Sequence, residues 1–149
     1  MAATQGIPVM DITKFVANNW YLFVALVVVI YLLLAGPITQ ILYKIKNVGS
    51  AQAIQLVNRE AGVFLDVCEP QEFKSAHIPQ AVNLPLRTLG ENLKHIEKYK
   101  AKPVIVTCRS GNRSVKGAIL LRKHGFANVY SLSGGLMGWE RDNLPVEKG

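Results

Sequence analysis

The fold is decided by one stretch of the chain, Pro103-Val104-Ile105-Val106-Thr107-Cys108-Arg109-Ser110-Gly111-Asn112-Arg113-Ser114. It opens with a β-branched run that begins at a proline, which is typical of a buried strand. The segment from Val115 to Gly125 then carries recurring apolar residues and ends in Lys-His-Gly, which predicts a helix with a cationic last turn and a glycine stop. The sequence therefore predicts a cysteine at the end of a strand, followed by a short polar loop and a helix.

This arrangement gives Cys108 a candidate chemistry. A tight loop that leads into a helix points several backbone N–H groups at one spot, and the helix dipole adds partial positive charge there. Surroundings of this kind, with neighbouring arginines such as Arg109 and Arg113, favour the thiolate form of a cysteine. We therefore interpret Cys108 as a nucleophile in an anion-binding loop; the alternative is a small buried apolar side chain.

Strands and helices are expected to alternate on both sides of this stretch. Apolar runs at residues 63–67, 81–85 and 129–132 predict further strands. Ser50 is the expected N-cap of a helix that ends before Gly62, Pro70 is expected in the first turn of a short helix, and Leu89 to Tyr99 has helical spacing. This alternation predicts an α/β fold with a mainly parallel sheet, whose ligands bind at the carboxyl ends of the strands.

Three segments resemble motifs of the rhodanese (sulfurtransferase) family and occur in the family's order. They are Asp66-Val67-Cys68-Glu69-Pro70-Gln71-Glu72-Phe73 with His77-Ile78-Pro79-Gln80-Ala81, then the loop from Cys108 to Ser114, then Val129-Tyr130-Ser131-Leu132-Ser133-Gly134-Gly135-Leu136-Met137-Gly138-Trp139. Together they cover roughly Ser50 to Pro145. The resemblance implies a rhodanese-like, mainly parallel five-stranded sheet flanked by helices, and sulfur transfer as the activity.

The resemblance also implies roles for individual residues. Cys108 is the expected catalytic residue, and the substrate and a cysteine persulfide would be held by the rest of the loop, namely Arg109, Ser110, Gly111, Asn112, Arg113 and Ser114. Asp66 is expected to accept hydrogen bonds next to the loop. Cys68 stands where the family often has arginine, and it is either an inert buried thiol or a resolving cysteine. Arg113 would either pair with a carboxylate or hold an anionic donor.

The length of the loop distinguishes between branches of this superfamily. Rhodanese-like phosphatases and arsenate reductases have five residues between the cysteine and the arginine. Here Arg113 follows Cys108 after four residues, and Ser114 takes the arginine position of the phosphatases. The smaller ring suits a single sulfane sulfur, so phosphatase or arsenate reductase activity is the less favoured alternative.

An apolar segment precedes the predicted domain. No charged residue occurs from Phe15 to Tyr43, and the length meets the roughly 20 apolar residues that cross a bilayer. Trp20, Tyr21 and Tyr43 lie where interfacial aromatic residues are expected. We predict one transmembrane helix at about 20–42. A buried core helix, an interfacial helix and a cleaved signal peptide are the alternatives, but the segment lacks a polar face and is not preceded by a basic region.

The expected organisation is a tail with one transmembrane helix in residues 1–43 and a rhodanese domain in residues 44–149. Lys44, Lys46 and Arg59 follow the helix whereas only Lys14 precedes it, so the positive-inside rule places the N-terminus outside and the catalytic domain in the cytoplasm. The resemblance to bacterial membrane-anchored rhodaneses implies the plasma (bacterial inner) membrane. Two cysteines in the whole chain fit a reducing compartment.

The function predicted from these features is a membrane-anchored sulfurtransferase. It would take a sulfane sulfur from a donor such as thiosulfate or a persulfide and pass it to a thiol acceptor. The alternative from another class is a membrane-tethered binding module for a transporter or insertion machinery, with little catalysis. The expected partners are the lipid bilayer, the sulfur donor and acceptor and a possible membrane protein.

Other cofactors and ligands are not expected. The cysteines and histidines lack metal-ligand spacing, so no metal is predicted. The net charge of +7 is spread without a long basic run, which does not support nucleic-acid binding. His77 is expected to bond a backbone carbonyl in its turn, and His95 and His124 are expected at the surface.

Overall fold

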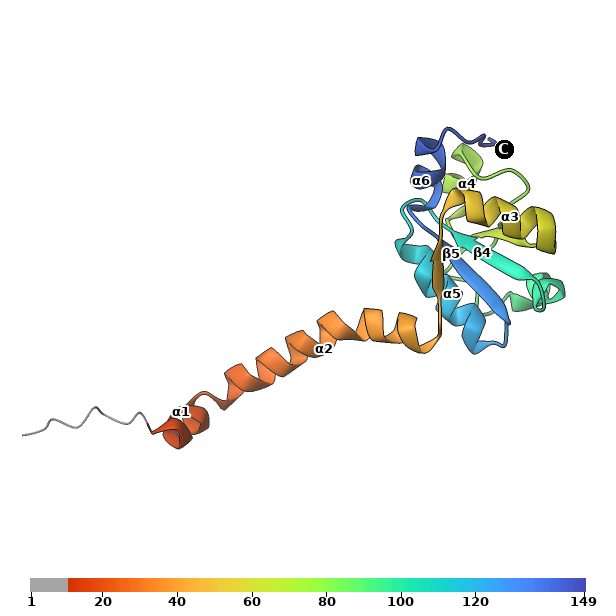
Figure 1. The fold of residues 1–149 in the computed structure, drawn as a ribbon. Helices are drawn as coiled ribbons and strands as arrows, with labels where there is room; N and C mark the ends of the chain where they lie inside the picture. The colour runs from red at the N-terminus through yellow and green to blue at the C-terminus, as the bar shows by residue number, and fades with distance from the viewer. Residues whose placement is uncertain (1–10) are drawn as a thin grey trace, which may run out of the picture. The chain divides into compact units, whose positions relative to one another are not determined.

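The structure is a computed structural model, and it describes residues 11–149. The chain divides into two compact units, one that ends at Ile38 and one over Thr39–Gly149 (Figure 1). The first unit contains α1 (Ile12–Asn18) and most of α2 (Trp20–Leu42). The second unit contains every strand of the described chain together with the helices around them.

Helix α2 is apolar over most of its length and is long enough to cross a membrane. Its segment Trp20–Thr39 has 20 residues with a mean hydropathy of 2.6. At 1.5 Å per residue this segment matches a hydrocarbon core of about 30 Å.

The sheet has five parallel strands in the order β1-β5-β4-β2-β3. The strands are β1 (Lys46–Val48), β2 (Val63–Asp66), β3 (Val82–Asn83), β4 (Pro103–Thr107) and β5 (Asn128–Leu132). All five residues of β4 are buried, as expected for the central strand of a sheet covered on both faces. The predicted α/β class and mainly parallel five-stranded sheet are confirmed.

Helices cover both faces of this sheet and bury a separate apolar cluster on each. Alternate residues of one strand point to opposite faces. Val104 and Val106 therefore join the cluster that contains Ala118 and Leu121 of α5 (Asn112–Lys123) and Ile96 of η1 (Leu93–Tyr99). On the other face, α3 (Ser50–Glu60) and α6 (Gly135–Arg141) cover Phe64, Ile105 and Leu132. The ring of Trp139 in α6 meets that of Phe64 edge-on at 5.4 Å.

The chain turns in opposite directions after β2 and after β4. From β2 it passes through α4 (Pro70–Ser75) to the edge strand β3, whereas from β4 it passes through α5 to β5 on the other side. The two loops that follow β2 and β4 diverge at neighbouring strand ends. Ligands of open α/β sheets bind at such a switch point, so the topology places the candidate site between these two loops.

Three helix predictions differ from the structure. Helix α5 begins at Asn112, three residues before the predicted start at Val115. Ser50 is the first residue of α3 rather than its N-cap; Gly49 is the N-cap and supplies no side-chain hydrogen bond. The segment from Leu89 to Tyr99 is not one helix, because turns fill residues 89–91 and η1 is a 3₁₀ helix. The expected apolar contacts still form, with Leu89 and Ile96 buried. A short crossover that packs through few side chains does not need a full α-helix.

Candidate active site

The two loops at the switch point are held together by strand pairing. Asp66, the last residue of β2, lies opposite Thr107, the last residue of β4. One residue further along, the N–H of Val67 donates to the carbonyl of Thr107 at 3.0 Å. Cys108 follows directly, so the predicted neighbourhood of Asp66 and Cys108 is present in the fold.

The sulfur of Cys108 accepts a hydrogen bond from the loop that it opens. The N–H of Gly111 donates to Cys108 Sγ at 3.1 Å. Gly111 has φ +101°, a left-handed conformation that glycine adopts without strain, and it is the N-cap of α5. The loop was predicted to point several backbone N–H groups at the cysteine, and the N–H of Gly111 is the one that forms this hydrogen bond. Cys108 itself is only 1% exposed, which shows that neighbouring residues cover the sulfur in this conformation.

The backbone of the loop is attached to the start of α6. The N–H of Leu136 donates to the carbonyl of Cys108 at 2.7 Å, and the N–H of Met137 donates to that of Arg109 at 3.0 Å. Gly135 makes this approach possible, because a Cβ there would lie 2.2 Å from the Cys108 carbonyl oxygen. Gly135 was not predicted as a site residue; the pair Gly134-Gly135 in the third motif was the available signal.

A buried pair of hydroxyl groups, those of Ser114 and Ser131, stabilises the loop from inside the domain. Ser114 Oγ lies 2.6 Å from the carbonyl oxygen of Gly111, to which it donates, and 2.7 Å from Ser131 Oγ. Both serines are buried, with exposures of 0% and 1%. Ser114 was predicted as part of the persulfide-binding loop, and the structure shows it inside the domain, where it shapes the loop. Ser131 was not predicted; a serine inside an apolar strand was its only signal.

Arg113 is engaged by a carboxylate. Its two terminal nitrogens donate to the two oxygens of Glu72, each at 2.8 Å. Glu72 also accepts from the N–H of Glu69 at 3.1 Å in the capping box of α4. The Arg113 guanidinium lowers the pKa of Glu72 to about 2, and the carboxylate raises the pKa of Arg113. Of the two partners expected for Arg113, the structure shows the carboxylate, and Glu72 is a site residue that sequence reasoning missed.

Asp66 organises the loop after β2. It is 2% exposed, and its Oδ1 accepts from the N–H of Cys68 at 2.9 Å, as expected of a hydrogen-bond acceptor. The side-chain amide of Asn83 closes the same loop through the carbonyls of Asp66 and Cys68, at 3.1 and 2.9 Å. Burial raises the pKa of Asp66 above its ordinary value, although the Cys68 N–H opposes that shift. Asp66 therefore stabilises the loop after β2, which lies next to the loop that begins at Cys108.

Cys68 is a buried free thiol in the same apolar cluster as Cys108. Burial and the neighbouring Asp66 carboxylate raise the pKa of the Cys68 thiol to about 12. Cys68 is therefore a neutral thiol near pH 7, a state that is a poor nucleophile. Between the two alternatives for Cys68, this environment favours the inert thiol.

The remaining loop side chains face solvent. Arg109, Ser110 and Asn112 are exposed. A cavity of about 220 Å³ lies beside the loop, lined in part by Ser110, Asn112 and Ser133, and Cys108 does not line it. A larger cavity of about 510 Å³ includes Gly62 and Val63 at the start of β2, the opposite end of that strand from Asp66.

The histidines lie outside this site. His77 Nδ1 is 2.8 Å from the carbonyl oxygen of Phe73, which confirms the expected backbone contact, and His95 and His124 are exposed as predicted. Within residues 11–149, no three Cys, His, Asp or Glu side chains are grouped so as to hold a metal ion.

Comparison with known proteins defines the class of this fold and site. The model of the rhodanese-like domain matches residues 50–142, which include both loops and the glycine turn before α6. The chain belongs to the rhodanese-like family. The resemblance inferred from the three sequence motifs is thereby confirmed.

Individual proteins similar to this chain include two bacterial relatives and one solved structure. Over 93% of this chain and 98% of its own length, a protein of Escherichia coli K12 designated "Uncharacterized protein YibN" is 33% identical, and an alignment that long includes the apolar helix α2. The thiosulfate sulfurtransferase GlpE of Pseudomonas syringae is 36% identical over 68% of this chain and 92% of its own. The crystal structure of a rhodanese-related protein from Thermoplasma volcanium has 29% identity and a TM-score of 0.63, covering 70% of this chain and 99% of that one.

Proposed function

We propose that this chain is a membrane-anchored sulfurtransferase that carries a sulfane sulfur as a persulfide on Cys108. The observation that carries the proposal is the hydrogen bond of 3.1 Å from the Gly111 N–H to Cys108 Sγ, at the junction of the central strand and a helix N-terminus. An amide aimed at a sulfur stabilises negative charge there, which both the thiolate and the terminal sulfur of a persulfide require. The similarity to a thiosulfate sulfurtransferase supports the same chemistry.

The reaction has two steps. The Cys108 thiolate attacks the outer sulfur of a donor such as thiosulfate; the new S–S bond forms as the donor's S–S bond breaks, and sulfite leaves with the bonding pair. A thiolate acceptor then attacks the terminal sulfur of the persulfide, forms its own persulfide and restores the Cys108 thiolate. No external oxidant or reductant is needed. Covalent catalysis of this kind predicts ping-pong kinetics.

Access to the sulfur is part of this proposal. Because Cys108 is 1% exposed, a donor reaches Sγ only when the covering residues move. The half-exposed pair between Arg113 and Glu72 joins the end of the loop to α4. An anionic donor would compete with Glu72 for the Arg113 guanidinium, so we propose that donor entry separates this pair.

The membrane anchor is the second part of the proposal. Helix α2 has the length and composition of a single span, and the alignment with the Escherichia coli relative includes it. The lysines that follow the helix favour a cytoplasmic domain and an external N-terminus in a bacterial inner membrane. Retention of the chain in membranes after an alkaline carbonate wash, with residues 1–42 present in its intact mass, would support the anchor. Release by the wash or loss of those residues would refute it.

The sulfur-carrier step is tested by the intact mass of the full chain in detergent. After treatment with thiosulfate, the protein should gain one sulfur atom, which an added thiol removes. Cys108→Ser should not gain it, whereas the matched control Cys68→Ser should behave as the wild type. Loading of Cys108→Ser, or equal loss in both variants, would refute Cys108 as the carrier.

A second candidate is a membrane-tethered binding module for a transporter or insertion machinery. The burial of Cys108 favours the binding module, because sulfur transfer requires an accessible sulfur whereas docking does not. The same mass measurement separates the two: a wild-type chain that never acquires sulfur from thiosulfate or from a small persulfide supports the binding module.

A further inference from the structure

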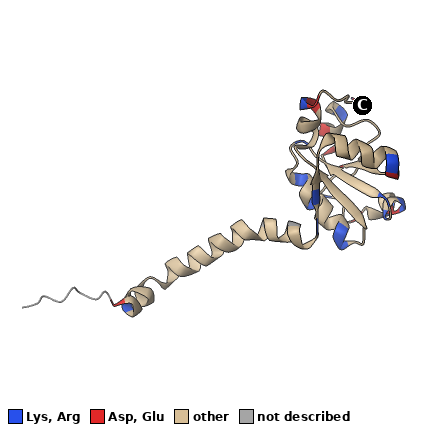
Figure 2. Ribbon diagram, viewed as in Figure 1, with Lys and Arg blue, Asp and Glu red and all other residues tan. Residues whose placement is uncertain are grey.

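Four cations gather where the chain leaves α2 and enters the second unit. Lys44 lies just before β1, Lys46 is the first residue of β1, and Arg122 and Lys123 lie in the last turn of α5. Arg122 Nε donates to the carbonyl of Tyr43 at 3.2 Å, and Lys123 Nζ lies 5.4 Å from the centre of the Tyr43 ring. These contacts bring the end of α5 to the residues directly after α2. Figure 2 shows the basic residues on β1 and at the end of α5.

No carboxylate neutralises this cluster within the described part of the chain. The ion pairs found in residues 11–149 involve Lys14, His77 and Arg113, and none of the four cations. Arg122 bonds only to neutral carbonyls, those of Tyr43, Phe126 and Ala127. Lys44, Lys46 and Lys123 are exposed. The cluster therefore keeps its full positive charge.

Three of the four cations line a cavity. A cavity of about 180 Å³ is lined by Lys44, Lys46 and Arg122 together with Asn128 and the start of β5. No acidic residue lines it. The three cations around this cavity provide the charge that attracts a phosphate group, and the two lysine ammonium groups provide N–H donors for it.

The position of the cluster along the chain favours a lipid headgroup as the source of such a phosphate. Lys44 follows Thr39, the end of the apolar segment, by five residues, three of which are helical. The chain therefore carries Lys44 no more than about 12 Å beyond the apolar segment. The headgroup layer of a bilayer is roughly 5–8 Å thick on each side. Lipid phosphates lie in that layer, whereas a soluble phosphate would need to come from bulk solvent.

We propose that the cavity between Lys44, Lys46 and Arg122 binds the phosphate of an anionic lipid headgroup next to the end of α2. This function is separate from sulfur transfer, but it rests on the proposed membrane anchor. Bound lipid would attach the domain to the membrane surface through α5 and β1, in addition to the covalent link through α2. Each basic residue near an anionic surface strengthens the attraction about fivefold.

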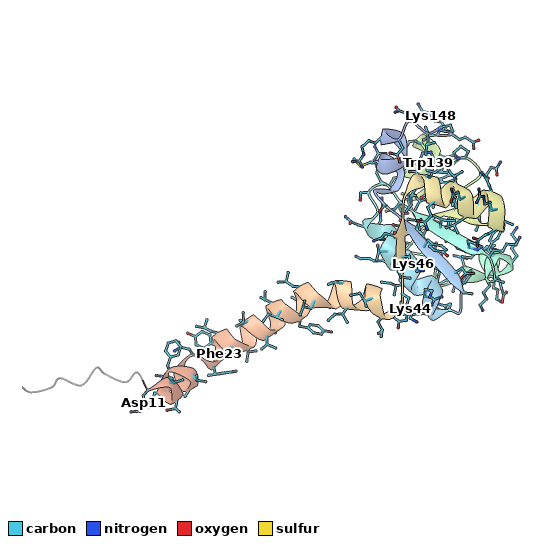
Figure 3. The ribbon with its side chains drawn as sticks, viewed as in Figure 1. Asp11, Phe23, Lys44, Lys46, Trp139 and Lys148 are labelled. Atoms are coloured by element: carbon cyan, nitrogen blue, oxygen red, sulfur yellow. The ribbon has the colours of Figure 1, made fainter. Side chains whose placement is uncertain are left out.

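Titration of the full chain in a non-ionic detergent with short-chain phosphatidylglycerol tests this site, with native mass spectrometry as the readout. The variant is Lys44→Gln with Lys46→Gln, which removes two charges and keeps the length of the side chains. The matched control is Lys74→Gln with Lys148→Gln, which removes the same charge elsewhere on the domain. Figure 3 shows Lys148 and Lys44 at opposite ends of the domain. Short-chain phosphatidylcholine and inorganic phosphate serve as neutral-headgroup and free-anion probes.

The expected result is saturable binding of phosphatidylglycerol that weakens about 25-fold in the Lys44/Lys46 variant and stays unchanged in the Lys74/Lys148 control. Sulfur loading of Cys108 should be the same in all three proteins. Equal binding of phosphatidylcholine, an equal loss in the control variant, or no phosphatidylglycerol binding at all would overturn the proposal. Inorganic phosphate that binds as tightly as the lipid would overturn it in favour of a soluble anion.

Discussion

Arg113 and Glu72 form a two-pronged ion pair, with both N–O distances at 2.8 Å, that joins the loop after β4 to the helix after β2. The Glu72 carboxylate thus engages both terminal nitrogens of Arg113, which lies in the first turn of α5. The pair also places a carboxylate where an anionic donor would approach. The charge that Arg113 brings to the loop motif is thus neutralised by Glu72 in the folded protein.

The first prediction concerns the affinity for thiosulfate. Glu72→Gln removes the carboxylate charge while its amide oxygen can still accept from the N–H of Glu69. We expect the KM for thiosulfate to fall about fivefold, the effect of roughly 1 kcal/mol from one half-exposed charge, with a smaller change in kcat. Steady-state sulfur transfer to cyanide measures both constants.

The control is Glu91→Gln, which removes an exposed charge from the connection before η1. A KM that rises or stays constant in Glu72→Gln would show that Arg113 does not take part in donor binding.

The second prediction concerns acid stability. The pKa of Glu72 is lowered from its ordinary value of 4.5 to about 2, so its ion pair stabilises the fold fully above pH 4.5 and loses that effect as the pH falls toward 2. Because the Glu72 side chain is 37% exposed, we expect no more than about 1 kcal/mol.

The measurement is the difference in unfolding free energy between wild type and Glu72→Gln from pH 6 to pH 2. The difference should be constant at the upper end and vanish at the lower end. A difference that grows on acidification would contradict the assigned pKa.

The third prediction concerns Cys68. With its pKa raised from 9.0 to about 12, this thiol stays protonated in the folded protein well above neutral pH. In Cys108→Ser, where Cys68 is the only thiol, alkylation should accelerate about tenfold per pH unit without a plateau up to pH 10. The stability that the neutral thiol contributes is complete below pH 9 and is lost as the pH rises toward 12.

Iodoacetamide kinetics on the folded chain provide the test. A plateau near pH 9, or a disulfide between Cys68 and Cys108 in thiosulfate-treated wild type, would instead support a resolving role.

The fourth prediction concerns Gly135. An added methyl group would lie 2.2 Å from the carbonyl oxygen of Cys108 and 2.8 Å from the nitrogen of Gly111, and the residue has φ +56°. We expect Gly135→Ala to destabilise the domain by about 3 kcal/mol or more and to abolish sulfur loading, because α6 and the loop must separate.

Gly49→Ala is the matched control, because a Cβ at Gly49 meets nothing within 4 Å. Thermal unfolding and intact mass after thiosulfate report on both variants. Normal loading in Gly135→Ala would show that the attachment of the loop to α6 is dispensable.

The fifth prediction concerns the buried hydroxyl pair. Ser114→Ala removes the donor to the Gly111 carbonyl and leaves Ser131 without this partner, which should cost about 1–3 kcal/mol. Sulfur loading should slow as well, because the Gly111 amide that faces the sulfur loses its support. Ser110→Ala, at an exposed position of the same loop, should leave the unfolding midpoint unchanged. Equal effects of the two substitutions would argue against a role for the pair.

Much of the fold could be predicted because it rests on local patterns. The apolar run from Pro103 to Thr107 became the central strand with the predicted bounds, and the predicted neighbourhood of Asp66 and Cys108 follows from pairing between β2 and β4. The helix expected from Leu89 was wrong because side-chain spacing identifies which residues are buried, here Leu89 and Ile96, and not how the backbone between them turns.

The site was predicted less completely than the fold. Glu72, Ser131 and Gly135 contact the loop from three other elements, and none of them is close to it in sequence. Their contacts come from the packing of α4, β5 and α6 around the end of β4, which no local pattern describes.

The order of residues along the chain was enough to determine that a cysteine ends a buried strand, that a glycine-containing turn and a helix follow it, and that a long apolar helix precedes the domain. Hydrophobic periodicity, glycine conformation and loop length are local properties, so they can be recognised without a structure. Only the folded chain decided that Arg113 is paired, that Cys68 is held as a neutral thiol and that the sulfur of Cys108 is covered. Charge state and access depend on the groups that packing brings within a few ångströms, and those groups come from distant parts of the chain.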